Sequence, residues 1–331
     1  MLHLFPEKAP ENATPEAPQA RVAAIRDSLW IDLHAPTAEE TALIEQAAGI
    51  TLPTWAAISE IEPSSRIHAV DGAMVMNLQL VSGVDSGRPA VAHASLILTA
   101  DQFITIRKED SYSFRALREA LARQPHDDGA VRLLLRLLDQ IVDRSADILE
   151  STGERLDQLS AAIFQFEEGD NLRLSTAELR SILKGIGRVQ FLLNKIFESL
   201  ATQLRVVSSL SASDTQGDRP FRLDREAKAA LESLSHDIKS LSSHSSYLIE
   251  TANFLLDAIV GRISIEQNAV MTVFSVVAVV FLPPTLIATI YGMNFRDMPE
   301  LALPYAYPLA LAVMLLSAVL PYLWFKKKGW L

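Results

Sequence analysis

The sequence contains no cysteine among its 331 residues. This absence excludes a disulfide framework, a thiolate zinc site, an iron–sulfur cluster and a cysteine nucleophile. Positive charge is also scarce, because 30 Lys and Arg stand against 40 Asp and Glu, for a net charge of −10. A nucleic-acid partner requires a basic face, so we expect none. The chain also lacks a P-loop, an HExxH motif and a Gly-rich loop. We therefore expect no enzyme and no covalently bound cofactor.

Charge is missing entirely from two long stretches near the C-terminus. Residues 267–295 and 301–325 form uncharged runs of 29 and 25 residues. Each run exceeds the roughly 20 apolar residues that span a bilayer core as a helix. Buried helices of a soluble protein rarely lack charge for so long. Residues 1–267 hold 26 basic and 38 acidic side chains, a net charge of −12. The sequence therefore predicts an acidic domain followed by two transmembrane helices in a lipid bilayer.

The ends of the chain predict its orientation in the membrane. Lys326–Lys328 follow the second uncharged run, and Trp324 and Trp330 flank them. Basic residues stay on the cytoplasmic side of a span, and aromatic residues lie at the interface. The N-terminus lacks the apolar segment of a signal peptide. Two spans return the chain to its starting side, so we expect both termini, including the basic tail 326–331, in the cytoplasm.

The first 125 residues have the pattern of a small α/β domain. Residues 1–20 are polar and rich in proline, which predicts a flexible N-terminal arm. Thr37, followed three residues later by Glu40, forms a capping-box pattern and predicts the start of a helix. We place the α/β domain over residues 21–125. Apolar runs of strand length predict strands at 29–33, 67–69, 73–81, 90–98 and 103–106.

Helical periodicity replaces this pattern from residue 126. No proline occurs between Pro125 and Pro220, and residues 126–220 are predicted to hold two long antiparallel helices. Another helix begins near Leu223 and meets no strong breaker before the first uncharged run. A monomer cannot bury the apolar stripes of such long helices, which favours an oligomer. We expect helices at about 128–168 and 175–210, a stalk helix continuing into the first span over 221–291, an external loop 292–303 and a second span 304–325.

The first uncharged run sorts its polar and small residues onto one side of a helix. With Thr272 at 0° and about 100° per residue, they fall on an arc of about 140°. An uncharged polar arc is typical of a water-filled pore for hydrated ions, and a proton relay would need Asp, Glu or His. Helix–helix packing is the competing explanation, since a single Ser or Thr often bonds only to its own helix. The arc consists of Asn268, Thr272, Ser275, Ala278, Leu282, Thr285 and Thr289.

A specific motif closes this run. Tyr291-Gly292-Met293-Asn294 ends it, Met-Pro-Glu-Leu follows from Met298, and the chain finishes in Phe-Lys-Lys-Lys-Gly-Trp-Leu. Ile-Glu-Gln-Asn at 265–268 and Val-Val-Phe-Leu-Pro-Pro-Thr-Leu-Ile-Ala at 279–288 precede it. In this order the motifs resemble the CorA family of divalent-cation channels. The resemblance implies an α+β cytoplasmic domain with a long helical stalk or funnel, two C-terminal transmembrane α-helices, and a homopentameric channel in the bacterial inner membrane.

The resemblance also implies a selectivity mouth built from the four motif residues. Mg²⁺ dehydrates reluctantly. Five Asn294 amide oxygens would therefore accept hydrogen bonds from the water that the ion keeps. Gly292 permits the tight turn, and Tyr291 and Met293 brace it by packing.

Other residues along the pathway receive roles from the same resemblance. Asn268 forms a second polar ring at the cytoplasmic end of the pore. Leu282 and Phe274 are apolar constrictions that form a hydrophobic gate by dewetting. In the external loop, which holds Asp297 and Glu300, Arg296 offsets the charge of Asp297, so Glu300 is the clearest attractor of cations.

Family members close when cytoplasmic Mg²⁺ binds carboxylates of the stalk helix between subunits. Here Lys239 stands where the resemblance leads us to expect Glu. One interpretation is a solvated polar helix face, and the other is a softer regulatory site that prefers Zn²⁺, Co²⁺ or Ni²⁺ because imidazole suits those ions. The remaining candidate ligands are Asp237, His244, Glu250 and Asp257.

The sequence thus predicts a pentameric channel that imports Mg²⁺, with Co²⁺ and Ni²⁺ as further substrates. Its partners are copies of itself, the lipid bilayer and divalent cations. Entry down the membrane potential yields about 4.6 kcal/mol per 100 mV for a divalent ion, so no ATP site is required. One alternative is a Zn²⁺ transporter of the ZntB branch of the same superfamily, coupled to protons. A more remote alternative is a two-span membrane sensor.

Overall fold

The computed structural model describes residues 1–5, 18–60, 66–123, 129–164, 175–212, 221–294, 298–299 and 303–328. The chain divides into two compact units, unit 1 over Met1–Leu255 and unit 2 over Leu256–Leu331. The boundary falls inside helix α7 (Arg225–Tyr291), which contributes to both units.

Unit 1 contains a six-stranded sheet in the order β1-β2-β6-β5-β4-β3. Only β2 and β6 run parallel, and the other neighbouring strands are antiparallel. Five strands lie where the apolar runs predicted them, because those runs carry enough apolar residues to be buried in the sheet. The strands are β1 (Leu2–Phe5), β2 (Trp30–His34), β3 (Ile67–Val70), β4 (Ala73–Ser82), β5 (Ala90–Leu98) and β6 (Phe103–Arg107).

The prediction of a flexible arm over residues 1–20 is wrong at both of its ends. Leu2–Phe5 forms β1, which pairs with β2 so that Leu4 lies opposite Ile31. The ring of Phe5 stacks on Trp30 at 5.1 Å between centroids. Helix α1 (Pro18–Asp27) already begins at Pro18. Four residues are too few to show a strand periodicity, and the strand exists because β2 offers it an edge. Residues 6–17 of the predicted arm lie outside the described residues.

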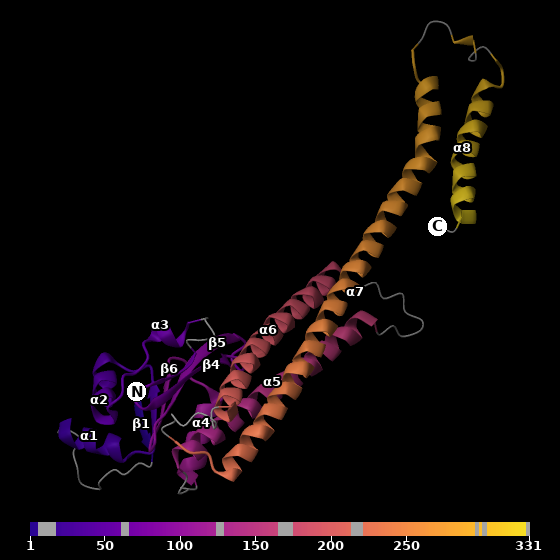
Figure 1. The fold of residues 1–331 in the computed structure, drawn as a ribbon. Coiled ribbons are helices and arrows are strands. Elements are labelled where there is room, and N and C mark those ends of the chain that lie inside the picture. The colour runs from indigo at the N-terminus through magenta and orange to yellow at the C-terminus, as the bar shows by residue number, and fades with distance from the viewer. Residues whose placement is uncertain are drawn as a thin grey trace. The chain divides into compact units, whose positions relative to one another are not determined.

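One face of the sheet is covered by α1, α2 (Ala38–Ala48) and α3 (Trp55–Ile58), as Figure 1 shows. Ile25 and Ile44 from these helices are fully buried against Ile31 and Ile97 of the sheet. The predicted capping box is confirmed. The amide of Glu40 donates to Thr37 Oγ1 at 3.2 Å, and the amide of Thr37 donates to Glu40 Oε2 at 2.9 Å.

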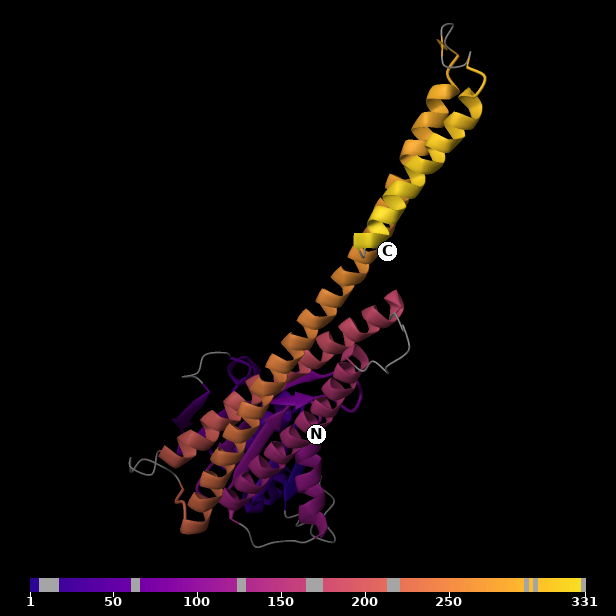
Figure 2. The ribbon, with the colours of Figure 1, turned by 90° about the vertical axis from the view of Figure 1, so that its right-hand side faces the viewer.

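Longer helices cover the other face. They are α4 (Tyr112–Arg123), α5 (Ala130–Phe164) and α6 (Thr176–Ala212), and the last two correspond to the two helices predicted after residue 126. The part of α7 that belongs to unit 1 packs along them (Figures 1 and 2). Gln190 Nε2 donates to Asn253 Oδ1 at 2.6 Å, and Leu248 lies against Gly153. Buried residues of this part recur every three, four or seven positions, as in a coiled coil: Ala227, Leu231, Leu234, Ile238, Ser245, Leu248, Ala252 and Leu255.

Helix α6 also closes one edge of the sheet. The short strand β3 pairs with β4 only as far as Met76. Beyond it, the amide of Gln79 donates to Thr202 Oγ1 at 3.0 Å, and Ser199 Oγ donates to the carbonyl of Gln79 at 2.7 Å. Side chains of α6 therefore take the place of a neighbouring strand.

A buried ion pair joins the two parallel strands. Arg107 donates to both carboxylate oxygens of Asp32, at 3.2 and 2.9 Å, and both side chains are almost completely buried. Thr105 Oγ1 donates to the same carboxylate at 2.9 Å, and Trp30 Nε1 donates to Thr105 at 3.1 Å. The guanidinium lies 4.8 Å from the centroid of the Phe114 ring. Because each charge is paired and hydrogen-bonded, this network is tolerated inside an apolar core.

Unit 2 consists of the last part of α7 and of α8 (Ala306–Lys328), which lies beside it (Figure 1). Helix α7 has 67 residues and continues through Pro283 and Pro284 without interruption. Both α7 and α8 contain a stretch that is long and apolar enough to cross a membrane. Only 6% of each stretch is buried inside the chain, so these apolar side chains face outward. Such exposure fits lipid or neighbouring subunits as surroundings and not water.

Candidate ion pathway

The predicted pore-lining residues all lie on α7 within unit 2, and none of them is buried. Asn268, Ser275, Leu282 and Thr289 follow one another at intervals of seven residues, so they form a row along one side of the helix. Leu282 is 67% exposed, although it is a large apolar side chain. The row is therefore an outer surface of the single chain.

All four hydroxyl groups among the predicted pore-lining residues donate a hydrogen bond to a backbone carbonyl of α7 itself. Ser275 donates to the carbonyl of Met271 at 2.8 Å, and Thr289 donates to that of Thr285 at 2.7 Å. Thr272 and Thr285 make equivalent bonds one turn back, at 2.8 and 2.7 Å. This is the local bonding that the sequence left open as a competing explanation. It has a chemical consequence, because a hydroxyl whose hydrogen is engaged presents only acceptor lone pairs. The row therefore offers acceptors, which suit water molecules held by a cation.

The four motif residues form the C-terminal end of α7. Tyr291 is the last helical residue, and the amides of Gly292 and Met293 donate to the carbonyls of Ala288 and Ile290 at 3.0 and 3.2 Å. The φ angle of Gly292 is not in the left-handed region, but a Cβ here would lie 3.3 Å from the oxygen of Ala288. Glycine therefore eases a close approach to the helix end, and a positive φ is not the reason for it.

Asn294 follows this turn and is exposed. Within the part of the chain that the structure describes, its side-chain amide has no hydrogen-bond partner. Both the oxygen and the nitrogen of the amide are thus available to an outside group. Asp297 and Glu300 of the predicted external loop lie outside the described residues.

The two residues predicted as a hydrophobic gate are also exposed in the single chain. Phe274 is 69% exposed and Leu282 is 67% exposed. They lie about 80° apart around the helix, so Phe274 stands at the border of the polar row. One copy of the chain forms no constriction with them.

The structure does not bring the four stalk candidates together. Asp237, His244, Glu250 and Asp257 are all exposed on α7. Among the described residues, no group of three His, Asp or Glu side chains could hold a metal ion. Glu250 lies about 220° around the helix from Asp237, so these two face different sides.

Asp237 nevertheless stands close to other carboxylates. The pKa of Asp139 on α5 is raised, first by partial burial and then by the negative charges of Asp143 and Asp237. Asp139, Asp143 and Asp237 therefore form an acidic cluster on α5 and α7 in unit 1.

Sequence reasoning missed a cavity of about 320 Å³ in unit 1. It lies between the turn that joins β4 to β5, the start of α4, and helices α5 and α6. Its lining residues come from separate segments around 80–86, 110–115, 141–148 and 196–199, and they share no motif. Only the tertiary fold brings these segments together.

Known proteins resemble this chain over nearly its whole length. The sequence family described as "CorA-like Mg2+ transporter protein" matches residues 26–327. The chain is 31% identical over 310 residues to the magnesium transport protein CorA of Pasteurella multocida, covering 93% of this chain and 94% of that protein. It is 32% identical over 306 residues to the protein of the same name from Escherichia coli K12, covering 92% of each.

A solved structure shares the fold. The complete CorA magnesium transporter from Methanocaldococcus jannaschii superposes with a TM-score of 0.74 and covers 91% of each chain. Its sequence identity to this chain is only 19%, so this likeness concerns the fold alone.

Proposed function

The chain belongs to the CorA-like Mg²⁺ transporter family, and from this premise we propose that it carries Mg²⁺ through a channel made of five copies. Membership places the protein among membrane ion transporters and not among enzymes. Each copy crosses the bilayer with its two candidate spans, and the first of these spans lines the channel. Curated relatives named as magnesium transport proteins favour Mg²⁺ over Zn²⁺ as the transported ion.

The observation that carries this proposal is the row of outward-facing acceptors on α7, followed by Asn294, whose side chain has no partner among the described residues. Mg²⁺ keeps several of its waters, and those waters donate hydrogen bonds outward. Five rows of hydroxyl oxygens and five Asn294 amide oxygens around one axis accept from this shell without stripping it. Asn268 supplies a second ring of the same kind. The two positive charges enter down the membrane potential.

Leu282 and Phe274 act as the gate in this proposal. Five copies of Leu282 on the polar row narrow the pathway with apolar surface, which excludes water and therefore hydrated ions when the copies approach. Phe274 takes part from the border of the row. In the external loop, Glu300 raises the local cation concentration at the mouth, while Arg296 offsets the charge of Asp297.

Regulation by cytoplasmic cations requires two copies. Asp237 and His244 share one side of α7, while Glu250 and Asp257 share another. A divalent cation held by these residues therefore lies between neighbouring subunits. The imidazole of His244 makes such a site more favourable for Co²⁺, Ni²⁺ or Zn²⁺ than a site made of carboxylates alone.

Ion uptake into liposomes tests the proposal directly. Purified protein should carry Mg²⁺, and also Co²⁺ and Ni²⁺, when a negative internal potential is applied and no proton gradient is present. Asn294→Ala should reduce Mg²⁺ uptake about tenfold or more, because the mouth loses its acceptors. The matched control is Asn253→Ala, an exposed asparagine elsewhere on α7, which should transport normally.

Uptake of Zn²⁺ alone and only with a proton gradient would support the zinc alternative. Full transport by Asn294→Ala would remove the mouth from the mechanism.

The membrane orientation has its own test, which the absence of cysteine makes simple. A single cysteine at Glu226 or Lys327 should react with a membrane-impermeant maleimide only after intact cells are permeabilised. A single cysteine at Met298 should react in intact cells. Any other pattern would contradict cytoplasmic termini and an external loop.

A further inference from the structure

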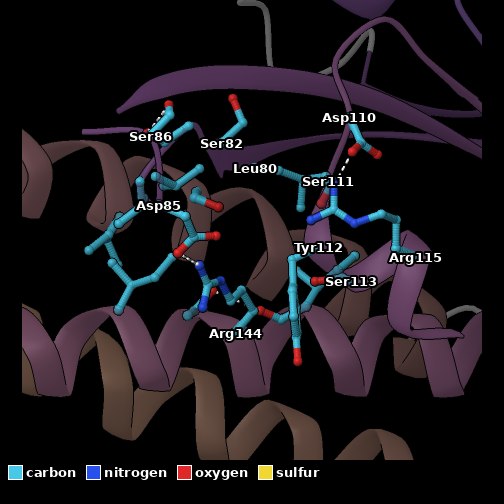
Figure 3. A pocket seen from close by; sticks show the side chains of 18 residues that line it. Leu80, Ser82, Asp85, Ser86, Asp110, Ser111, Tyr112, Ser113, Arg115 and Arg144 are labelled. Atoms are coloured by element: carbon cyan, nitrogen blue, oxygen red, sulfur yellow. Dashed lines mark hydrogen bonds and ion pairs between the residues drawn. The ribbon is translucent and has the colours of Figure 1, made fainter. Parts of the chain in front are cut away.

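The cavity lies in unit 1, whereas the candidate ion pathway belongs to unit 2. Charged and apolar side chains both line the cavity. Figure 3 shows Arg144 and Arg115 reaching into it from α5 and α4. Leu80, Ile148 and Ile196 form an apolar part of its wall. The cavity therefore combines two guanidinium groups with an apolar surface, within a volume of about 320 Å³.

Arg144 is held firmly, but its anionic partner is not. Its side chain is only 21% exposed, and its guanidinium lies 4.9 Å from the centroid of the Tyr112 ring. It donates to Asp85 Oδ1 at 2.6 Å. Asp85 is 72% exposed and sits in the turn between β4 and β5. An ion pair with such an exposed carboxylate contributes little stability, whereas a mostly desolvated guanidinium gains much from a well-placed anion.

Arg115 stands on the other side of Tyr112 (Figure 3) and is half exposed. It pairs with Asp110, which also accepts from Arg107 at 3.4 Å. Burial raises the pKa of Asp110, but Arg115 and Arg107 together bring it below its ordinary value. Asp110 is therefore an anion held by two arginines, and Asp85 is the carboxylate that an incoming anion displaces more easily.

We propose that this cavity binds a small phosphate monoester, whose phosphate replaces Asp85 as the partner of Arg144 and also accepts from Arg115. Guanidinium groups match phosphate oxygens in pairs. The first-turn amides of α4, which begins at Tyr112 in the cavity wall, add positive potential. The cavity is far larger than the few water volumes that inorganic phosphate needs, since one water occupies about 30 Å³. The organic part of the ligand rests on Leu80, Ile148 and Ile196.

Calorimetric titration of the full-length protein in detergent tests this proposal. The probes are adenosine 5′-monophosphate and glucose 6-phosphate, and inorganic phosphate and adenosine are the reference compounds. At least one monoester should bind saturably and at least tenfold more tightly than either reference compound. Arg144→Gln and Arg115→Gln should each weaken binding about tenfold or more. Asp85→Ala should strengthen it, by up to about fivefold, because the competing carboxylate is gone.

Arg155→Gln is the matched control, since Arg155 is an exposed arginine on the same helix α5 outside the cavity. It should bind like the natural protein. Arg115 is half exposed, so its substitution keeps the test decisive even if Arg144→Gln fails to fold. The proposal is overturned if neither monoester binds at millimolar concentration, or if Arg115→Gln binds as well as the natural chain. Equal affinity for inorganic phosphate would exclude a role of the organic group in binding. Equal affinity for adenosine would exclude a role of the phosphate.

Discussion

The two units of this chain treat polar groups in opposite ways. In unit 1, Asp32 and Arg107 are buried, paired and bonded to further side chains of the same chain. In unit 2, Asn294 and the hydroxyl row face outward, and large apolar side chains such as Leu282 surround them. The buried ion pair of unit 1 is therefore satisfied by groups of the same chain. Unit 2 has groups that only other copies, water, ions or lipid can satisfy.

This contrast separates two kinds of sequence information. Buried residues of unit 1 make their contacts within one chain, so their substitution should affect folding first. Residues of the α7 row contribute almost nothing to the fold of a single copy, so their substitution should affect transport first. Experiments can test both expectations, the effect on folding and the effect on transport.

Removing Asp32 is the most severe test of the first expectation. Asp32→Ala leaves the guanidinium of Arg107 buried without a counter-charge, which should cost about 3–5 kcal/mol of stability. For a unit of this size, we expect the melting temperature to fall by about 10 °C. Thermal unfolding of the purified protein in detergent measures it. The double variant Asp32→Ala with Arg107→Leu should recover part of the loss, because no unpaired charge remains. If Asp32→Ala were as stable as the natural protein, the buried ion pair would not be needed for the stability of unit 1.

The proposed gate offers the next largest effect, on transport. Leu282→Asn should raise Mg²⁺ flux through the closed channel severalfold, because a polar ring keeps the constriction wet. Liposome flux at high internal Mg²⁺ measures it, and the melting temperature of unit 1 should not change. Val277→Asn is the control, since Val277 lies about 140° away from Leu282 around the helix. An equal leak in both variants would show general disruption of the span.

A smaller effect concerns pH and unit 1. Burial lowers the pKa of His93 below its ordinary value of 6.5, Arg66 lowers it further, and Glu109 raises it only in part. His93 is therefore neutral in the fold, while the unfolded chain takes up a proton first as the pH falls. Its contribution to stability is present above pH 6.5 and is lost on acidification through the folded-state pKa. His93→Gln should lose less stability between pH 7 and pH 5. An unchanged pH profile would exclude His93 as its source.

The smallest effects are expected on the hydroxyl row, where they decide between pore lining and packing. Ser275→Ala or Thr289→Val should lower Mg²⁺ conductance by about twofold at most, because each removes one acceptor ring among several. The oligomer should remain intact in size-exclusion chromatography. The reverse pattern, normal conductance with loss of the oligomer, would assign the row to helix packing.

Much of this molecule was predictable because its local patterns are strong. The run at 73–81 has the length and composition of a buried strand, and β4 covers Ala73–Ser82. The stretch after Leu223 contains no strong breaker, and α7 is accordingly one helix to Tyr291. The motif from Tyr291 to Asn294 was found at the helix end because its residues are contiguous.

The features that were missed depend on contacts between distant residues. The Asp32–Arg107 pair joins positions 75 residues apart, and nothing in either segment alone indicates the other. Strand β1 was missed because Leu2–Phe5 has no periodicity until β2 provides its partner. The four stalk candidates lie on two sides of α7, so the single chain does not bring them together and the regulatory site stays a prediction.

The bonds from Ser199 and Thr202 to Gln79 have a consequence for crowding. An open strand edge is a template on which another chain can add its own strand. In the five-copy channel that we propose, identical chains gather at high local concentration, where such wrong pairing would be frequent. Here the edge groups of Gln79 are already occupied by two hydroxyls, which offer no continuing ladder. The part of β4 around Gln79 is therefore no template for a strand of another copy.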